Sequence, residues 1–311
     1  MKKLIIDTDC GIDDALAISM ALTDPCVEVL ALTCVSGNVQ LPHVLRNVGI
    51  VLDAVGAGAI PIFAGADRPL LMQAVHASEV HGSDGLGDAG FPDTARRPEK
   101  ETAALALIRL ARQHPGAILV PLGPLSTIAL ALAIEPALPN LLGGTVLMGG
   151  AAHGIGNASP VAEFNIYADP EAAAMVFERG LNPIIVDWEA TLARPLLWES
   201  WDRLMAAGPL GQHFIAPMNA QLTERARARG RQGVLMPDPL AMAVALDIDC
   251  ATLYEAHVSV DIGWSVARGM TAVDRRPQAA RPNARIVSAV DSHRFESMIE
   301  RACAAACTSA A

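Results

Sequence analysis

Short apolar runs alternate with Ala/Leu-rich segments along this chain, and turns with Gly, Asn or Asp separate them. The apolar runs are rich in Val, Ile and Leu, which predicts buried strands. They lie at 4–6, 27–35, 117–121, 145–148 and 183–186. Segments such as 15–22 and 126–133 follow them and predict helices. This alternation is typical of βαβ units, so we expect a Rossmann-like α/β fold with an open, mostly parallel sheet flanked by helices.

The last third of the chain is less regular. It predicts a helical region, a loop that enters a helix, two strands and a closing helix. These segments are 199–229, 233–247, 256–262, 285–290 and 292–306. No linker, charge block or low-complexity tract divides the sequence, so we expect one domain over 1–311. In such a sheet the carboxyl ends of the strands meet at one edge, where an active site is expected.

Composition narrows the functional classes. Hydrophobic residues make up 52% of 311 residues, which supports a large core. The net charge of -10 disfavours nucleic acids and anionic membranes as partners, and it favours small neutral or cationic ligands. The six cysteines form no CxxC pair, and we expect them to be reduced. With no signal-peptide pattern and no apolar run of membrane-spanning length, a cytoplasmic protein is expected.

The turn after the first predicted strand is the densest cluster of charge. Asp7, Asp9, Asp13 and Asp14 lie within eight residues, and such crowding calls for a bound cation or shared protons. A divalent metal is the simpler solution. Asp13 can also cap a helix that begins at Ala15. The alternative is that Asp13 and Asp14 only cap this helix and favour its dipole, while Asp7 and Asp9 are surface acids.

Three other polar segments are candidates for binding. The stretch 157–165 is rich in Asn and carries a Glu, which suits a polyhydroxyl ligand such as a sugar, although an ordinary surface loop fits as well. Asp238 lies between two prolines before an apolar run, and taken alone it is best interpreted as a helix cap. The glycine-rich loop 81–87 carries His81, as a lid over a pocket or a plain mobile loop would.

Taken together, these motifs resemble the inosine-uridine preferring nucleoside hydrolases in the same order along nearly the whole chain. The matching segments are 7–14, 35–38, 148–150, 162–165, 169–173, 238–239, 269–271 and 274–276. The resemblance implies an enzyme that uses Ca²⁺ to hydrolyse the N-glycosidic bond of a ribonucleoside, giving free base and ribose. It also implies a homodimer or homotetramer.

The resemblance assigns roles to individual residues. The implied calcium ligands are Asp9, Asp14, the backbone carbonyl of Leu122, and Asp238. The implied ribose-binding residues are Asp13, Asn38, Asn157, Glu163 and Asn165, with Met148 packing nearby. Asp9 is expected to be the general base that deprotonates a calcium-bound water. Attack by this water on the anomeric carbon predicts inversion of configuration.

Three departures mark an atypical member, and one is the segment 187–189, where Trp188 and Glu189 replace part of the family's more usual Asp-Leu-Thr-like sequence. Cys10 stands where the family usually has Pro, and Pro237 stands where well-known members have a histidine that helps to protonate the leaving base. Proline cannot donate a proton. Three residues are candidates for activating the leaving group instead: His81, Glu189, and Trp188 through stacking on the base.

Two other functions compete with hydrolysis of nucleosides. A non-catalytic nucleoside or ribose binder would keep the metal and sugar residues and lack leaving-group activation, as Pro237 suggests. Asp7 and Asp9 also have the spacing found in haloacid-dehalogenase-like phosphatases, but that fold needs a later lysine. The chain contains only Lys2, Lys3 and Lys100, so we rank phosphoryl transfer lower.

Overall fold

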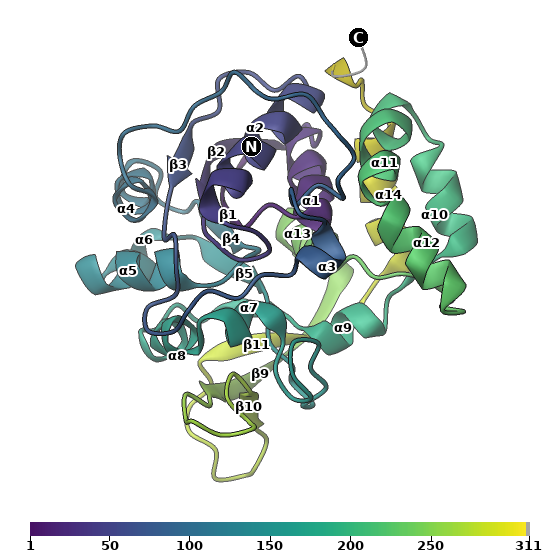
Figure 1. Ribbon diagram of the computed structural model, residues 1–311. Helices are drawn as coiled ribbons and strands as arrows, with labels where there is room; N and C mark the ends of the chain where they lie inside the picture. The colour runs from purple at the N-terminus through teal and green to yellow at the C-terminus, as the bar shows by residue number, and fades with distance from the viewer. Residues whose placement is uncertain (309–311) are drawn as a thin grey trace.

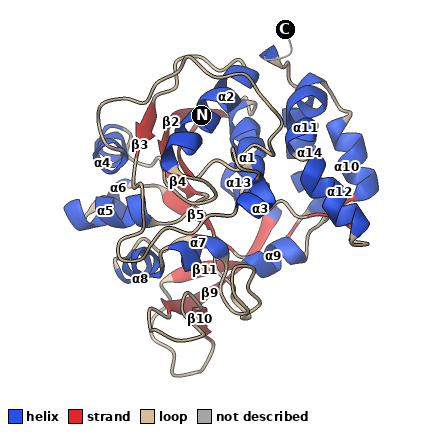
Figure 2. Cartoon of the chain, in the orientation of Figure 1, coloured by secondary structure: helices blue, strands red, loops and turns tan. Residues whose placement is uncertain are grey.

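A central sheet of nine strands organises residues 1–308, which are the residues that the computed structural model describes (Figures 1 and 2). The strand order is β10-β9-β11-β6-β5-β4-β1-β2-β3. The strands are β1 (Lys2–Thr8), β2 (Val27–Cys34), β3 (Ile62–Ala64), β4 (Ile118–Pro121), β5 (Gly144–Met148), β6 (Ile184–Val186), β9 (Ala251–Val260), β10 (Thr271–Asp274) and β11 (Ala284–Val290). Strands β7 (Leu196–Leu197) and β8 (Gly233–Val234) form a separate pair.

Helices cover both faces of the sheet (Figure 2). The longer ones are α1 (Ile12–Leu22), α2 (Leu41–Ala54), α4 (Ala103–Gln113), α5 (Ser126–Ile134), α8 (Pro170–Glu178), α10 (Trp198–Met205), α12 (Ala220–Ala228), α13 (Pro237–Leu246) and α14 (Ser292–Ala304). The shorter ones are α3 (Ser78–His81), α6 (Leu138–Leu141), α7 (Phe164–Ala168), α9 (Trp188–Leu192), α11 (Ala216–Met218), the π-helical η1 (Gly211–Ile215) and the 3₁₀-helical η2 (Ile248–Cys250). Among residues 1–308 we find no helix with the length and apolar character needed to cross a membrane.

Alternation along the strands divides the hydrophobic core into two layers. In β1, Leu4 and Ile6 face the cluster formed with α1, α2, α13 and α14, whereas Ile5 faces the cluster formed with α4, α5 and α8. Neighbouring residues of a strand point to opposite faces, so a sheet with helices on both sides needs continuous apolar runs. The runs recognised in the sequence have this origin, and the predicted α/β class is confirmed.

The order of the strands changes direction at β1, and this change determines where the site lies. Strand β1 pairs with β2 on one side and with β4 on the other, and all three are parallel. After β1 and after β4 the chain therefore turns toward opposite faces of the sheet. A crevice opens between the ends of these two strands. The predicted location at the carboxyl ends of the strands corresponds to this crevice.

Several predicted boundaries were wrong. Helix α1 begins at Ile12 and not at Ala15, so Asp13 lies in its first turn and is not its cap. Region 199–229 is divided into α10, η1, α11 and α12, with Gly208 and Pro209 between α10 and η1. Strand β9 begins five residues before the predicted 256–262 and runs antiparallel between β11 and β10. The expected domain range, 1–311, includes residues 309–311, which lie outside the described residues.

We expect the buried face of α1 to carry much of the stability. Leu16 is fully buried, so Leu16→Ala should lower the free energy of unfolding by about 2–5 kcal/mol through lost apolar contact and a cavity. Leu105→Ala is the matched control, because Leu105 of α4 is 47% exposed and should change the value by less than about 0.5 kcal/mol. Urea unfolding followed by circular dichroism measures both, and equal losses would contradict the packing described here.

Candidate active site

The turn between β1 and α1 is closed by a carboxylate. Asp14 accepts hydrogen bonds from the backbone N–H of Gly11, at 2.8 Å, and from Thr8 Oγ1. Cys10 has a φ of 25°, which is unfavourable for a residue with a side chain. Helix α1 is thus capped at Gly11, with Asp14 reaching back to it, in a turn that carries strain.

The Cys10 thiol is buried beside these acids. Burial, followed by the charge of Asp14, raises the pKa of the thiol well above its usual range. A protonated thiol is a poor ligand for a hard cation such as Ca²⁺. Cys10 therefore acts as a small apolar residue of the core, and its carbonyl accepts a 3.1 Å hydrogen bond from Asn47 Nδ2.

Asp9 lies wholly buried at the bottom of the crevice. Its Oδ2 accepts a 2.7 Å hydrogen bond from the backbone N–H of Asn38, and its Oδ1 has no partner within residues 1–308. A methyl group on Gly37 would overlap Asp9 Oδ2, and one on Gly123 would lie 3.0 Å from Asp9 Cγ. Glycine at both positions lets two loops approach the carboxylate closely. Burial, followed by the charge of Asp14, raises the pKa of Asp9 well above its usual range.

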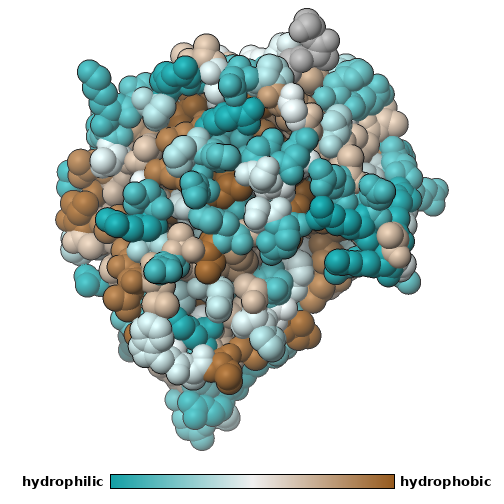
Figure 3. All heavy atoms as spheres, in the orientation of Figure 1, coloured by the Kyte–Doolittle hydropathy of each residue, from teal (hydrophilic) through white to brown (hydrophobic). Residues whose placement is uncertain are grey.

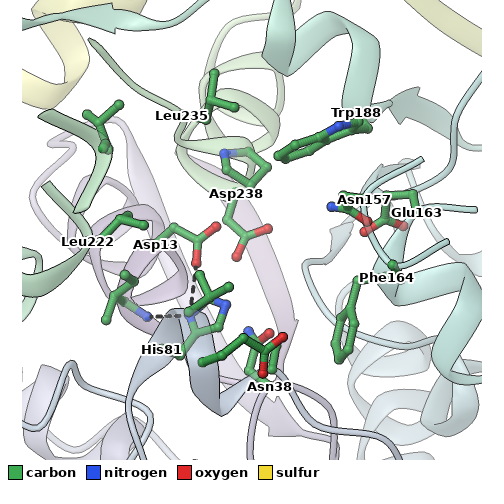
Figure 4. Close-up of a pocket in the computed structure, with 18 of the residues that line it drawn as sticks. Asp13, Asn38, His81, Asn157, Glu163, Phe164, Trp188, Leu222, Leu235 and Asp238 are labelled. Atoms are coloured by element: carbon green, nitrogen blue, oxygen red, sulfur yellow. Dashed lines mark hydrogen bonds and ion pairs between the residues drawn. The ribbon is translucent and has the colours of Figure 1, made fainter. Parts of the chain in front are cut away.

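Asp238 joins the same group of carboxylates from the other side of the crevice (Figure 4). Asp13, Asp14 and Asp238 each offer an oxygen, and the three oxygens lie within 4.8 Å of one another. Helix α13 is capped at Met236, and Asp238 lies in its first turn, so the interpretation of Asp238 as a cap was wrong. Burial, then the charges of Asp13 and Asp14, raises the pKa of Asp238 well above its usual range.

This arrangement fits a hard divalent cation. Within residues 1–308, no lysine or arginine forms an ion pair with Asp9, Asp13, Asp14 or Asp238. Oδ1 of Asp9 and Oδ1 of Asp13 are buried and accept no hydrogen bond in that range. Carboxylate oxygens are the donors that Ca²⁺ prefers, and a cation would relieve the repulsion among them.

A second polar group forms the opposite wall. Glu163 caps α7 and accepts backbone hydrogen bonds from Gly150 and Asn165, both at 2.9 Å. Asn165 Nδ2 donates to the carbonyl oxygens of Leu122, at 2.7 Å, and Met148, at 3.2 Å. One side chain thereby links the turns after β4 and β5. Burial raises the pKa of Glu163 to about 7.

A cavity of about 560 Å³ opens above these groups (Figure 4). The predicted site residues that line it are Asp13, Asn38, His81, Leu122, Met148, Asn157, Glu163, Asn165, Trp188 and Asp238. Asp9 and Asp14 lie beneath this surface, close enough to perturb the pKa of Asp238. Asn38 lines the cavity and also contacts the buried acids beneath it, because its Nδ2 donates a 3.2 Å hydrogen bond to Asp14 Oδ2.

His81 is packed at the end of α3 and is 8% exposed. Its Nδ1 accepts a 3.2 Å hydrogen bond from the N–H of Ile12 and lies 3.7 Å from Asp13 Oδ1. Burial lowers the pKa of His81 to about 4, so the ring is neutral near pH 7 and carries its proton on Nε2. The imidazole is therefore a fixed part of the wall, and the prediction of a mobile loop does not hold for it.

The other two candidates for activating the leaving group, Trp188 and Glu189, differ in position. Trp188 lines the cavity, whereas Glu189 does not. Glu189 Oε1 accepts backbone hydrogen bonds from His153 and Ile155, at 2.9 and 3.0 Å. Glu189 thus holds the loop that leads to Asn157.

Sequence reasoning missed the wall formed by α12 and the chain after it. Leu222, Arg225, Ala226 and Arg229 line the cavity, followed by Arg231. The first four have the spacing of one helix face, which was a signal available in the sequence. Phe164 and Leu235 also line the cavity and were likewise missed (Figure 4).

Comparison with known proteins identifies the family. The family model described as inosine-uridine preferring nucleoside hydrolase matches residues 4–297. The chain belongs to this family. The inosine-uridine preferring nucleoside hydrolase of Leishmania major is 34% identical over 301 residues, which cover 94% of this chain and 95% of that protein. The predicted family is confirmed.

Other members of the nucleoside hydrolase family differ in the bases that their names specify. The pyrimidine-specific ribonucleoside hydrolase RihB of Escherichia coli O157:H7 is 34% identical over 304 residues, with 96% of each chain covered. A structure of an inosine-guanosine nucleoside hydrolase is also 34% identical, with a TM-score of 0.89 over 97% of this chain and 98% of that one.

We expect Gly37 to be essential for the packing of Asp9. Gly37→Ala places a methyl group against Asp9 Oδ2 and should lower the free energy of unfolding by about 1–3 kcal/mol. Gly58→Ala is the control, since a methyl group there meets no atom within 4 Å. Urea unfolding of both variants measures the difference, and an unchanged Gly37→Ala protein would refute the close approach.

Proposed function

We propose that this protein hydrolyses the N-glycosidic bond of a ribonucleoside to free base and ribose, with Ca²⁺ as its cofactor. The observation that carries the proposal is the buried, unpartnered Oδ1 of Asp9 beneath a cavity whose wall carries amides and a carboxylate, in the described part of the chain. A carboxylate that can act as a general base, next to a polar pocket of the size of a sugar, suits attack by water on an anomeric carbon. Membership of the nucleoside hydrolase family supports the same reaction.

The carboxylates and one carbonyl would hold the cation. We assign Asp9, Asp14, Asp238 and the backbone oxygen of Leu122 as ligands, and Asp13 offers another oxygen close by. A bound Ca²⁺ would offset the repulsion among these groups and lower the pKa of a neighbouring water. The set contains oxygen donors alone, as a hard cation requires.

Other roles in the reaction are assigned to individual side chains. Asp9 accepts the proton of the attacking water at Oδ1, and its Oδ2 stays bonded to Asn38. The ribose hydroxyls are bound by Asp13, Asn38, Asn157, Glu163 and Asn165. Their oxygens also stabilise the positive charge of an oxocarbenium-like transition state, and Met148 packs against the sugar. Direct attack by water inverts the configuration at the anomeric carbon.

The two alternative functions differ in their support. A phosphatase of the haloacid dehalogenase type needs a lysine in its site, and Lys2 instead donates to the carbonyl oxygens of Ala245 and Leu246. Lys3 contacts Glu28 and His114, and Lys100 does not line the cavity. The nucleoside or ribose binder keeps one argument in its favour, which is the absence of an N–H donor at Pro237.

Purified protein should release reducing sugar from at least one member of a ribonucleoside panel, and Asp9→Asn should lower kcat by at least about 100-fold. Asn keeps an oxygen for the N–H of Asn38 but cannot accept the proton of water, so the affinity for nucleoside should change little. Asp67→Asn, at a 74% exposed side chain, is the control. Binding with no turnover across the panel would favour the binder, and turnover of phosphate esters instead would favour the phosphatase.

Calcium should bind at one site per chain. Asp14→Asn and Asp238→Asn each remove a charge from the buried group, and each should weaken binding at least about tenfold in calorimetry. Asp249→Asn, at an exposed position, should bind as the unaltered protein does. Chelation with EGTA should abolish turnover, and added Ca²⁺ should restore it. Unchanged affinity in both site variants would remove the metal assignment.

A further inference from the structure

One side of the cavity is cationic, although the chain as a whole is acidic. Arg225 of α12, Arg229 at the C-terminal cap of that helix and Arg231 after it line this side. Leu222, on the same helix, lies across the cavity from Asn157 and Glu163 (Figure 4). The surface over α12 is also strongly hydrophilic, at the right of the view in Figure 3. The local charge therefore differs from the net charge of -10, which favours neutral or cationic ligands.

The three arginines differ in the hydrogen bonds and ion pairs that their side chains form. Arg225 donates to the carbonyl oxygen of Glu79, at 2.5 Å, and to Gln221, at 3.0 Å, so it joins α12 to α3. The guanidinium groups of Arg229 and Arg231 form no hydrogen bond or ion pair within residues 1–308. Arg227, on the other side of α12, is paired with Asp202 and stacked on Trp198. Two cations thus remain available at the cavity.

Three of the four acids that line the cavity lie away from the arginines, and the fourth, Glu79, lies beside Arg225. Asp13, Asp238 and Glu163 are buried in the floor and the opposite wall, where the ribose is proposed to bind. Glu79 is exposed at the mouth, on α3. A ligand whose ribose occupies the polar floor would then place its other end near Arg229 and Arg231.

The walls between the two ends suit a flat ring. Trp188 and Leu235 lie together at one end of the cavity, and Leu222 and Phe164 lie on opposite sides of it (Figure 4). Aromatic and aliphatic faces bind a heterocyclic base by stacking and by excluding water. A base held there would have the arginine side of the cavity at its edge.

The chemistry of the leaving group points the same way. When water attacks the anomeric carbon, the bond from that carbon to the base nitrogen breaks and its electron pair passes to the base. The position next to Asp238 is Pro237, which lines the cavity without a proton to give. Cations near the base stabilise the negative charge that develops on the ring, which then takes a proton from solvent.

We propose that the preferred substrate is a ribonucleoside whose base carries a carboxylate, bound by Arg229 and Arg231. This inference rests on the proposed nucleoside hydrolysis. A guanidinium pairs with a carboxylate through two parallel hydrogen bonds, which gives specificity as well as affinity. Both arginines are exposed, so their attraction is screened by salt.

The test compares uridine with its two carboxylated isomers, 5-carboxyuridine and 6-carboxyuridine, and with uridine 5′-monophosphate. At least one isomer should exceed uridine in kcat/KM by about tenfold or more at low salt. That preference should shrink when the ionic strength is raised from about 0.01 M to about 1 M. Preference for the 5′-monophosphate alone, or for neither isomer over uridine, would overturn the proposal.

Variants locate the effect. The double variant Arg229→Gln/Arg231→Gln should bring the ratio of carboxylated substrate to uridine close to one. Arg227→Gln changes the same helix on its other side and should keep the ratio. A ratio that survives in the double variant, or falls equally in Arg227→Gln, would overturn the assignment. If the unaltered protein releases ribose from no nucleoside, the proposed function itself is wrong; if it cleaves neutral nucleosides without preference, the substrate class alone is wrong.

Discussion

Repulsion among buried carboxylates is the constraint on which the site depends. Asp9, Asp13, Asp14 and Asp238 are buried together in one crevice, and the charges of neighbouring carboxylates add to burial in raising the pKa values of Asp9 and Asp238. Such a group is stable only with protons or a cation in place. Glycines at 37 and 123 bring two loops against Asp9, so the fold is built to keep this carboxylate enclosed and not to relieve its charge by exposure to water.

The sheet supplies the rigidity that this arrangement needs. The turns after β1, β4 and β5 end at one edge, and Asn165 ties two of them together through their carbonyl oxygens. Glu163 orders the next turn through backbone N–H groups. The polar end of the cavity, where the ribose is proposed to bind, is therefore held by buried hydrogen bonds, while the α12 side presents exposed side chains.

Much of the site was open to prediction because its residues follow strands directly. Asp13, Asn38 and Met148 were expected at or just after strand ends and Glu163 in the polar stretch 157–165, and all four line one cavity. The burial of His81 was not predictable, because it depends on contact with the N–H of Ile12, 69 residues away. Arg229 was overlooked because an exposed helix face reads as ordinary surface until something is known to lie opposite it.

The sequence by itself determined the alternating elements, the family, and the acids that gather behind β1, because apolar periodicity and local turns depend on neighbouring residues. The tertiary structure decided three other matters: that Asp238 joins Asp13 and Asp14, that Glu189 holds a loop instead of lining the cavity, and that arginines line one side of the cavity. Each depends on contacts between segments far apart in the chain. Local sequence patterns carry no information about which distant segments come into contact. Those contacts determine the burial and the charged neighbours of each site residue, and therefore its chemistry.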